Sequence, residues 1–110
     1  MPKFVTIGYG DRAGYERTSK DVRDAAHAHD AELKKRGTLM GVMGAPVQVR
    51  NTLAGGVRTE NSAFMLSPLP VAGFAVIDAA DLAEAVQIVS KTPCAVAHGV
   101  VEVWPLEQAG

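Results

Sequence analysis

The segment AGFAVIDAADLAEAVQIVSKTP, residues 72–93, limits the fold more than any other part of the sequence. Its apolar run, Gly73–Ile77, has the composition of a strand and passes within a few residues into helical spacing. That spacing predicts a helix over Asp81–Ser90, which Pro93 should stop. A last apolar run predicts a strand over Val100–Trp104. The C-terminal half therefore has the order strand, helix, strand.

The N-terminal half has the same order of elements. Lys3–Ile7 predicts a strand, because its residues favour β structure, and a polar loop, DRAGYERT at residues 11–18, should follow it. A helix is expected next, with Thr18 or Ser19 as its cap and Gly37 as its end.

An additional segment separates the two halves. Thr38–Met43 and Pro46–Arg50 are candidate strands, residues 53–56 have the composition of a turn, and Val57–Thr59 is expected to return as the second arm of a hairpin. Residues 60–71 have no clear period, yet they hold four bulky apolar side chains. We therefore predict a hairpin inserted between two β-α-β units.

This order indicates an α+β fold of the ferredoxin-like, split β-α-β type, formed by a single domain over residues 1–110. Two helices would cover one face of an antiparallel sheet. Strand residues 74–77 are all apolar, so both faces of the sheet need cover. The chain offers no third layer, and we therefore expect a homodimer in which a second copy covers the other face.

The composition excludes several classes of partner. A net charge of −1 gives the chain no field that would attract nucleic acid or an anionic membrane surface. No apolar run approaches the length of a membrane span. A single cysteine, Cys94, excludes a disulfide within the chain. We therefore expect a cytoplasmic protein that binds neither nucleic acid nor membrane.

Several short motifs recur in order along almost the whole chain with the spacing of one family. They are YGD at residues 9–11, Gly37 with Leu39, GFAVID with DLAEAV, then Pro93, His98-Gly99 and VEVWP. This set resembles the YCII-related proteins, in particular the branch named for its DGPF motif. The resemblance implies a dimeric α/β barrel and an activity on small molecules.

The chain departs from that family at polar positions. The DGPF motif falls on residues 61–64, where Asn61 replaces the acid and only Phe64 is kept. Three further polar or charged positions are apolar: Leu66, Leu69 and Trp104. We interpret Asn61, Phe64 and Trp104 as candidate substrate contacts. The alternative is that Phe64–Val71 and Trp104 form a subunit contact, and the uncovered sheet face favours this alternative.

Three residues are candidates for acid–base chemistry. His29 lies on an apolar helix face and is expected to point toward the sheet, either as an acid or base or as a core histidine bonded to a backbone carbonyl. His27, about 200° further round the helix, is expected in solvent. Asp11 follows the first strand as a base or as a turn residue that bonds its own backbone. His98, before the last strand, is a functional group or a surface loop residue.

The leading hypothesis from the sequence is a YCII-like enzyme that transfers a proton in a lyase or isomerase reaction on a small apolar or aromatic metabolite. His29 would assist the transfer, and no organic cofactor would be needed. Three histidines and one cysteine without ligand spacing argue against a metal site. The alternative is a non-catalytic module that binds a ligand or partner. It is favoured by Asn61 and by Lys35, which stands where the family's His–Asp pair has its acid.

Overall fold

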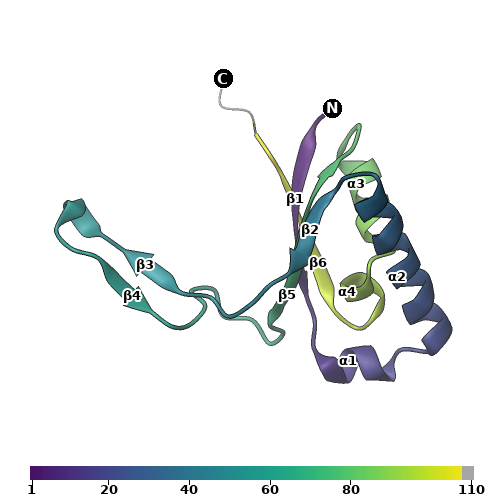
Figure 1. Cartoon of the computed structure of the whole chain (residues 1–110), viewed down its shortest axis with the longest axis horizontal. Helices are drawn as coiled ribbons and strands as arrows, with labels where there is room; N and C mark the ends of the chain where they lie inside the picture. The colour runs from purple at the N-terminus through teal and green to yellow at the C-terminus, as the bar shows by residue number, and fades with distance from the viewer. Residues whose placement is uncertain (108–110) are drawn as a thin grey trace.

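Strands β1, β2, β5 and β6 form one antiparallel sheet in the computed structural model, which describes residues 1–107 (Figure 1). Their bounds are Lys3–Tyr9, Leu39–Val42, Val71–Asp78 and Val100–Pro105. The order across the sheet is β2-β5-β1-β6, and each neighbouring pair is antiparallel. Strands β1 and β2 therefore run parallel, as do β5 and β6, so two β-α-β units interleave in one sheet. The α+β class expected from the sequence is confirmed.

The helices lie on one side of this sheet (Figure 1). Their bounds are Arg12–Arg17 for α1, Lys20–Lys35 for α2, Leu82–Val89 for α3 and Pro93–Val96 for α4. Helix α2 ends as the sequence predicts: Gly37 has a φ of +88°, and the amides of Gly37 and Thr38 donate to the carbonyls of Lys34 and Leu33. This pairing is a Schellman motif, which needs a left-handed residue after the helix.

The short helices α1 and α4 correct two expectations. Residues 11–18 were expected to form a polar loop, but Asp11 caps a helix there by accepting a hydrogen bond from the Gly14 amide at 2.8 Å. Pro93 was expected only to stop a helix, but it also begins α4, where its missing N–H removes no bond. In α3, Ala85 and Val89 are buried, whereas Leu82 and Val86 are exposed.

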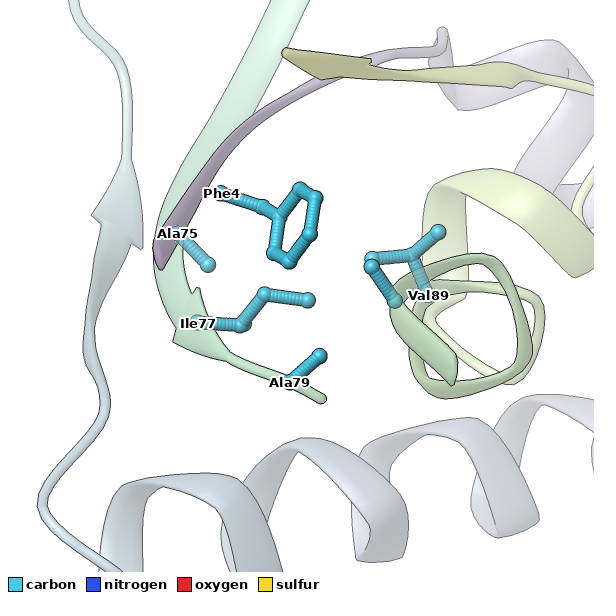
Figure 2. Packing of buried hydrophobic residues seen from close by; sticks show 6 residues of the cluster. Phe4, Ala75, Ile77, Ala79 and Val89 are labelled. Atoms are coloured by element: carbon cyan, nitrogen blue, oxygen red, sulfur yellow. The ribbon is translucent and has the colours of Figure 1, made fainter. Parts of the chain in front are cut away.

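The core lies between the sheet and α3 and is built largely from small side chains. Phe4 and Ile77 extend from neighbouring strands toward Val89 of α3, as Figure 2 shows. Ala79 and Ala85 are fully buried beside them. The alanines let the helix approach the sheet closely, so little apolar surface is needed to fill this side of the molecule.

The opposite face of the sheet, called the open face here, has no described helix on it (Figure 1). One row of paired residues runs across it: Leu39, Val76, Val5 and Trp104. Leu39 is 64 % exposed and Trp104 is 52 % exposed. The prediction that both faces of the sheet are apolar is confirmed, and cover by a second copy stays a prediction.

The inserted hairpin is a separate two-stranded sheet of β3, Gln48–Arg50, and β4, Arg58–Glu60. A 3₁₀ turn at Thr52–Ala54 joins the strands, where the sequence predicted a turn. We call residues 44–64 the arm. It projects from the sheet on the side away from the helices, along the longest dimension of the molecule, 52 Å (Figure 1).

Candidate functional site

A cavity of about 690 Å³ lies between the sheet and the helical layer. Strands β1 and β5 supply its floor, helix α2 supplies one wall, and α4 supplies another. Its lining includes Thr6, Gly8, Gly73, Asp30, Lys34 and Cys94. Its size is that of pockets that hold small organic molecules.

Two glycines of the sheet lie in the floor of the cavity. Gly8 and Gly73 face each other across β1 and β5, so no side chain rises from the floor at this point. A Cβ added to Gly8 would stand 2.8 Å from the Cys94 sulfur. The glycine therefore lets α4 lie close to the sheet, and the cavity is left open beside it.

Asp30 of α2 is the most unusual polar group in the cavity wall. The Asp30 side chain is half-buried. Its Oδ1 atom is closed to solvent and has no hydrogen-bond partner in the part of the chain that the structure describes. Burial raises the pKa of the Asp30 carboxyl above its ordinary value. The charges of His29, His27 and Lys34 lower that pKa by less. A desolvated carboxyl whose buried oxygen makes no hydrogen bond within the described fold is suited to proton transfer.

Cys94 faces the same cavity as a half-buried free thiol. Burial, and secondly the negative charge of Asp30, raise its pKa. The group is therefore a neutral thiol at pH 7 and is a poor nucleophile, since the thiolate is the reactive form. Among these two groups, the carboxyl is the better candidate for chemistry.

Tyr15 and His27 link α1 to α2 beside the cavity. The Tyr15 hydroxyl lies 2.8 Å from His27 Nε2, and the Arg23 guanidinium lies 4.9 Å from the centre of the Tyr15 ring. His27 is exposed, as the sequence predicts, but its ring has a partner, which the sequence did not indicate. The contact joins α1 to α2, and both residues line the cavity.

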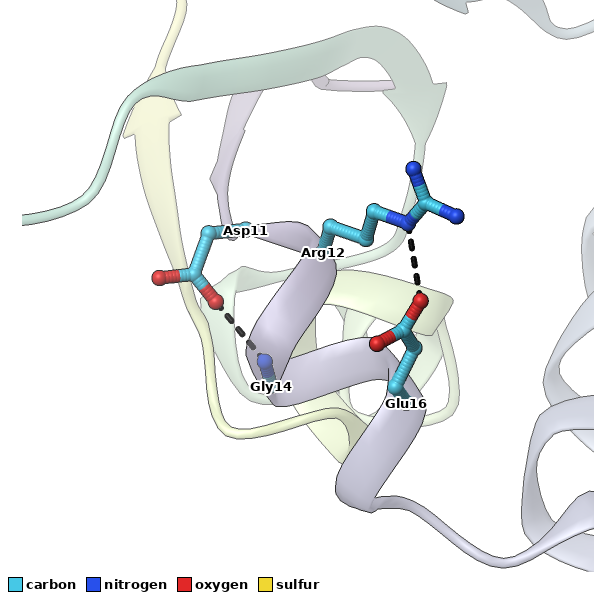
Figure 3. Close-up of polar contacts among 4 residues, drawn as sticks. All are labelled: Asp11, Arg12, Gly14 and Glu16. Carbon is cyan, nitrogen blue, oxygen red and sulfur yellow. Dashed lines mark hydrogen bonds and ion pairs between the residues drawn. The ribbon is translucent and has the colours of Figure 1, made fainter.

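Asp11 and His98 come together around Gly14. Figure 3 shows the Asp11 carboxylate at the amide of Gly14, with Arg12 and Glu16 paired at 2.8 Å on the same helix. A Cβ on Gly14 would lie 3.2 Å from Asp11 Oδ1 and 3.3 Å from His98 Cβ. Asp11 also lines the cavity, yet its contact is the local one that the sequence left as the alternative to a base. His98 is exposed and has a φ of +62°.

His29 lies away from this cavity, between α2 and α3. Its Nε2 atom is 2.7 Å from the carbonyl oxygen of Ile88. That carbonyl belongs to the last turn of α3, whose carbonyls have no partner within the helix. The contact is the core-histidine alternative, in which the ring joins two helices.

Replacing His29 by leucine should therefore cost stability. The substitution leaves the Ile88 carbonyl without its partner, and we expect a loss of about 1–3 kcal/mol in the free energy of unfolding. Urea unfolding measures the loss. His29→Gln is the matched control, because its amide keeps a donor and should lose less. Equal stability of the leucine variant and the original chain would contradict the assignment.

The candidate substrate contacts lie elsewhere in the molecule. Asn61 and Phe64 are exposed residues of the arm, and the Arg50 guanidinium lies 5.7 Å from the centre of the Phe64 ring. Trp104 is on the open face. None of the three lines the large cavity.

A smaller hollow of about 350 Å³ lies at one end of the open face. Residues 65–69, which connect the arm to β5, pass over Tyr9, Val100 and Glu102 there. The Tyr9 hydroxyl donates a hydrogen bond to Glu102 Oε1 at 2.7 Å, and this bond raises the pKa of Tyr9. Both polar groups are paired with each other, which makes this hollow a weaker candidate for chemistry.

The sequence contained a pattern that indicates the cavity wall. His27, Asp30 and Lys34 are spaced i, i+3, i+7 and form one stripe along α2. The acid–base candidates named from the sequence were His29, Asp11 and His98, and Asp30 was not among them. A floor of glycines from β1 and β5 is a second pattern, but it becomes meaningful only once the register of those strands is known.

No model of a known protein family matches the chain, and no curated protein matches it. Across residues 1–107, no group of three or more His, Cys, Asp or Glu side chains could hold a metal ion. No helix in the same range is long and apolar enough to cross a membrane. The function has to be inferred from the cavity itself.

Proposed function

We propose that the protein is a YCII-like enzyme that transfers a proton within a small apolar or aromatic metabolite, in a lyase or isomerase reaction. The large cavity would hold the substrate, and the Asp30 carboxyl would move the proton. One observation carries this proposal: Asp30 has a buried oxygen, in the wall of a cavity of ligand size, that finds no hydrogen-bond partner among residues 1–107.

The chemistry follows from the environment of that carboxyl. In its ionised form it accepts a proton from a carbon next to a carbonyl group, and in its protonated form it returns the proton at another atom. Burial raises the pKa of the carboxyl, so it is a stronger base than a solvated carboxylate. A carboxyl that works in this way needs no organic cofactor. Asp30 therefore takes the acid–base role that was expected of His29, because the His29 ring is hydrogen-bonded to a carbonyl of α3.

The lining of the cavity supports an apolar substrate. Thr6, Gly8 and Gly73 present a low, largely uncharged floor, and Asp30 and Lys34 are charged groups on the wall above it. Pockets for small molecules commonly combine apolar surface with a few polar groups that fix orientation. The Cys94 side chain lies over Gly8, so a bound ring would sit beside this thiol.

The proposal includes the ferredoxin-like fold and a homodimer of the dimeric α/β barrel type. The strand order β2-β5-β1-β6, with two interleaved β-α-β units, supports the fold. The apolar row that includes Trp104 and Leu39 on the open face supports contact between two sheets.

A second candidate function is a non-catalytic module that binds a small ligand. It is favoured by a specific observation: Asp11, the other carboxylate of the cavity, is bonded to the amide of Gly14 and caps α1. Proton transfer would then depend on Asp30 alone.

A binding test with a blocked cavity examines both candidates. Small phenols and lactones are added to the labelled protein, and we expect the amide resonances of Gly8 and Gly73 to shift. Ala31→Leu, which adds bulk to the cavity lining, should weaken that binding about tenfold or more. Ala28→Leu is the matched control, since Ala28 lies on the same helix but outside the lining. Shifts that survive Ala31→Leu unchanged would place the ligand elsewhere.

A further inference from the structure

We infer that the arm clasps a second copy of the chain, with Leu53 at its tip as the contact residue. The inference rests on the proposed homodimer, and adds to it a second element of the interface. Sheet-to-sheet contact alone would leave the arm in solvent.

The arm has little to hold it in an isolated chain. Its strands β3 and β4 pair with each other and with no strand of the main sheet. A two-stranded hairpin by itself is at best marginally stable in water. Apolar side chains along the arm are nevertheless exposed: Val47, Val49, Leu53 and Val57. An ordered hairpin with this surface indicates that another surface packs against it.

The tip of the arm has an unusual conformation. Leu53 has a φ of +55° and Ala54 a φ of +56°, in the left-handed region that favours glycine and asparagine. Leu53 is also 97 % exposed, so no contact with the described part of the chain accounts for a large apolar residue at this position. Positive φ at two successive residues is the geometry of a tight hairpin turn, so the feature that remains unexplained is the exposed leucine side chain. The sequence keeps a leucine where the backbone would be more relaxed with asparagine.

The surface area of the chain indicates how large the missing contact is. The chain exposes 7842 Å², whereas a folded monomer of 11.6 kDa is expected to expose about 5,800 Å². The excess is about 2,000 Å² per chain. If each of two copies buried this amount, the interface would fall in the size class of obligate homodimers.

The dimensions of the arm suit a clasp around a second sheet. Packed sheets lie about 10 Å apart, and residues 44–53, if extended, reach about 30 Å. The arm projects from the open-face side, so a copy seated on that face would lie alongside it (Figure 1). The tip would pass the second sheet and reach the flank of the partner. Twofold symmetry would place the partner's arm on the first copy in the same way.

Limited digestion with trypsin tests whether the arm is covered. Arg50 and Arg58 lie on the two strands of the arm, and each is a cleavage site. We expect both sites to be protected at concentrations where sedimentation shows a dimer, and to become accessible on dilution to monomer. Arg17, at the exposed end of α1, serves as the internal reference.

A substitution at the tip tests the residue itself. Leu53→Asn suits the left-handed backbone and removes the apolar contact, so the hairpin should be kept while the dimer dissociation constant rises about tenfold or more. Val22→Ser removes a half-exposed apolar residue from α2 and should leave the constant unchanged. Sedimentation equilibrium measures both.

The outcomes separate this inference from the proposed dimer and from the proposed reaction. A stable dimer whose Arg50 and Arg58 sites are always cut would overturn the clasp and keep the sheet-face dimer. A monomer at all concentrations would overturn both. A Leu53→Asn variant that dimerises as well as the original chain would remove Leu53 from the interface. The binding test on the large cavity does not depend on any of these results.

Discussion

Replacing Asp30 by asparagine should abolish turnover and, at pH 7, make the protein more stable. The asparagine side chain keeps the size of the carboxyl but cannot accept and return a proton, so we expect the rate to fall by at least about 100-fold. The rate loss is measured once a substrate is found among the ligands that bind the cavity, and thermal unfolding gives the stability.

The gain in stability follows from the sign of the pKa change. In the unfolded chain the Asp30 carboxyl has its ordinary pKa of 3.8, and burial raises that pKa in the folded protein. The folded protein therefore holds the proton more tightly, and the contribution of Asp30 to stability is complete below the unfolded pKa and is lost as the pH rises through the folded pKa. At pH 7 the neutral amide avoids the cost of a desolvated charge.

A control on the same helix makes this result specific. Asp24 is exposed and pairs with Lys20 at 2.6 Å, so Asp24→Asn should change neither activity nor stability by much. If Asp30→Asn lowered the melting temperature at pH 7 and kept its activity, Asp30 would be a structural residue and the proposed reaction would lose its acid–base group.

Replacing Gly99 by alanine should destabilise the fold severely. A Cβ at this position would collide with the backbone carbonyl of Tyr9 and would stand 2.5 Å from the carbonyl oxygen of Cys94. Neither atom can turn aside as a side chain would, so β1 or the end of α4 has to move. We expect a loss of about 3 kcal/mol or more in the free energy of unfolding, from denaturant titration.

Gly44→Ala is the matched control for this substitution. A Cβ on Gly44 meets nothing within 4 Å, and the stability should change little. Because Gly99 donates its amide to Cys94, the damage from Gly99→Ala should also reach the α4 wall of the cavity. Wild-type stability in Gly99→Ala would show that α4 does not pack against β1 as described.

The elements with strong local patterns could be predicted from the sequence. Apolar runs predict β1, β5 and β6. Helix α2 is predicted by its apolar spacing, with Ser19 before the helix and Gly37 after it. These elements depend on interactions between neighbours in the chain, which residue type and spacing describe well. Helix α1 was missed because a six-residue helix has almost no period, and its one marker, the Asp11 cap, also fits a turn.

The site depended on contacts between distant parts of the chain. His29 and Asp30 are neighbours in sequence, yet one lies against α3 and the other faces the cavity, because a helix turns about 100° at each residue. Which of the two is available for chemistry depends on where α3 and the cavity lie around α2. Three features follow from tertiary contacts: Gly8 and Gly73 meet in register, α4 closes over Gly8, and a carboxyl oxygen of the cavity wall has no partner among the described residues. Desolvation is a property of the assembled layers, and no spacing along the chain encodes it.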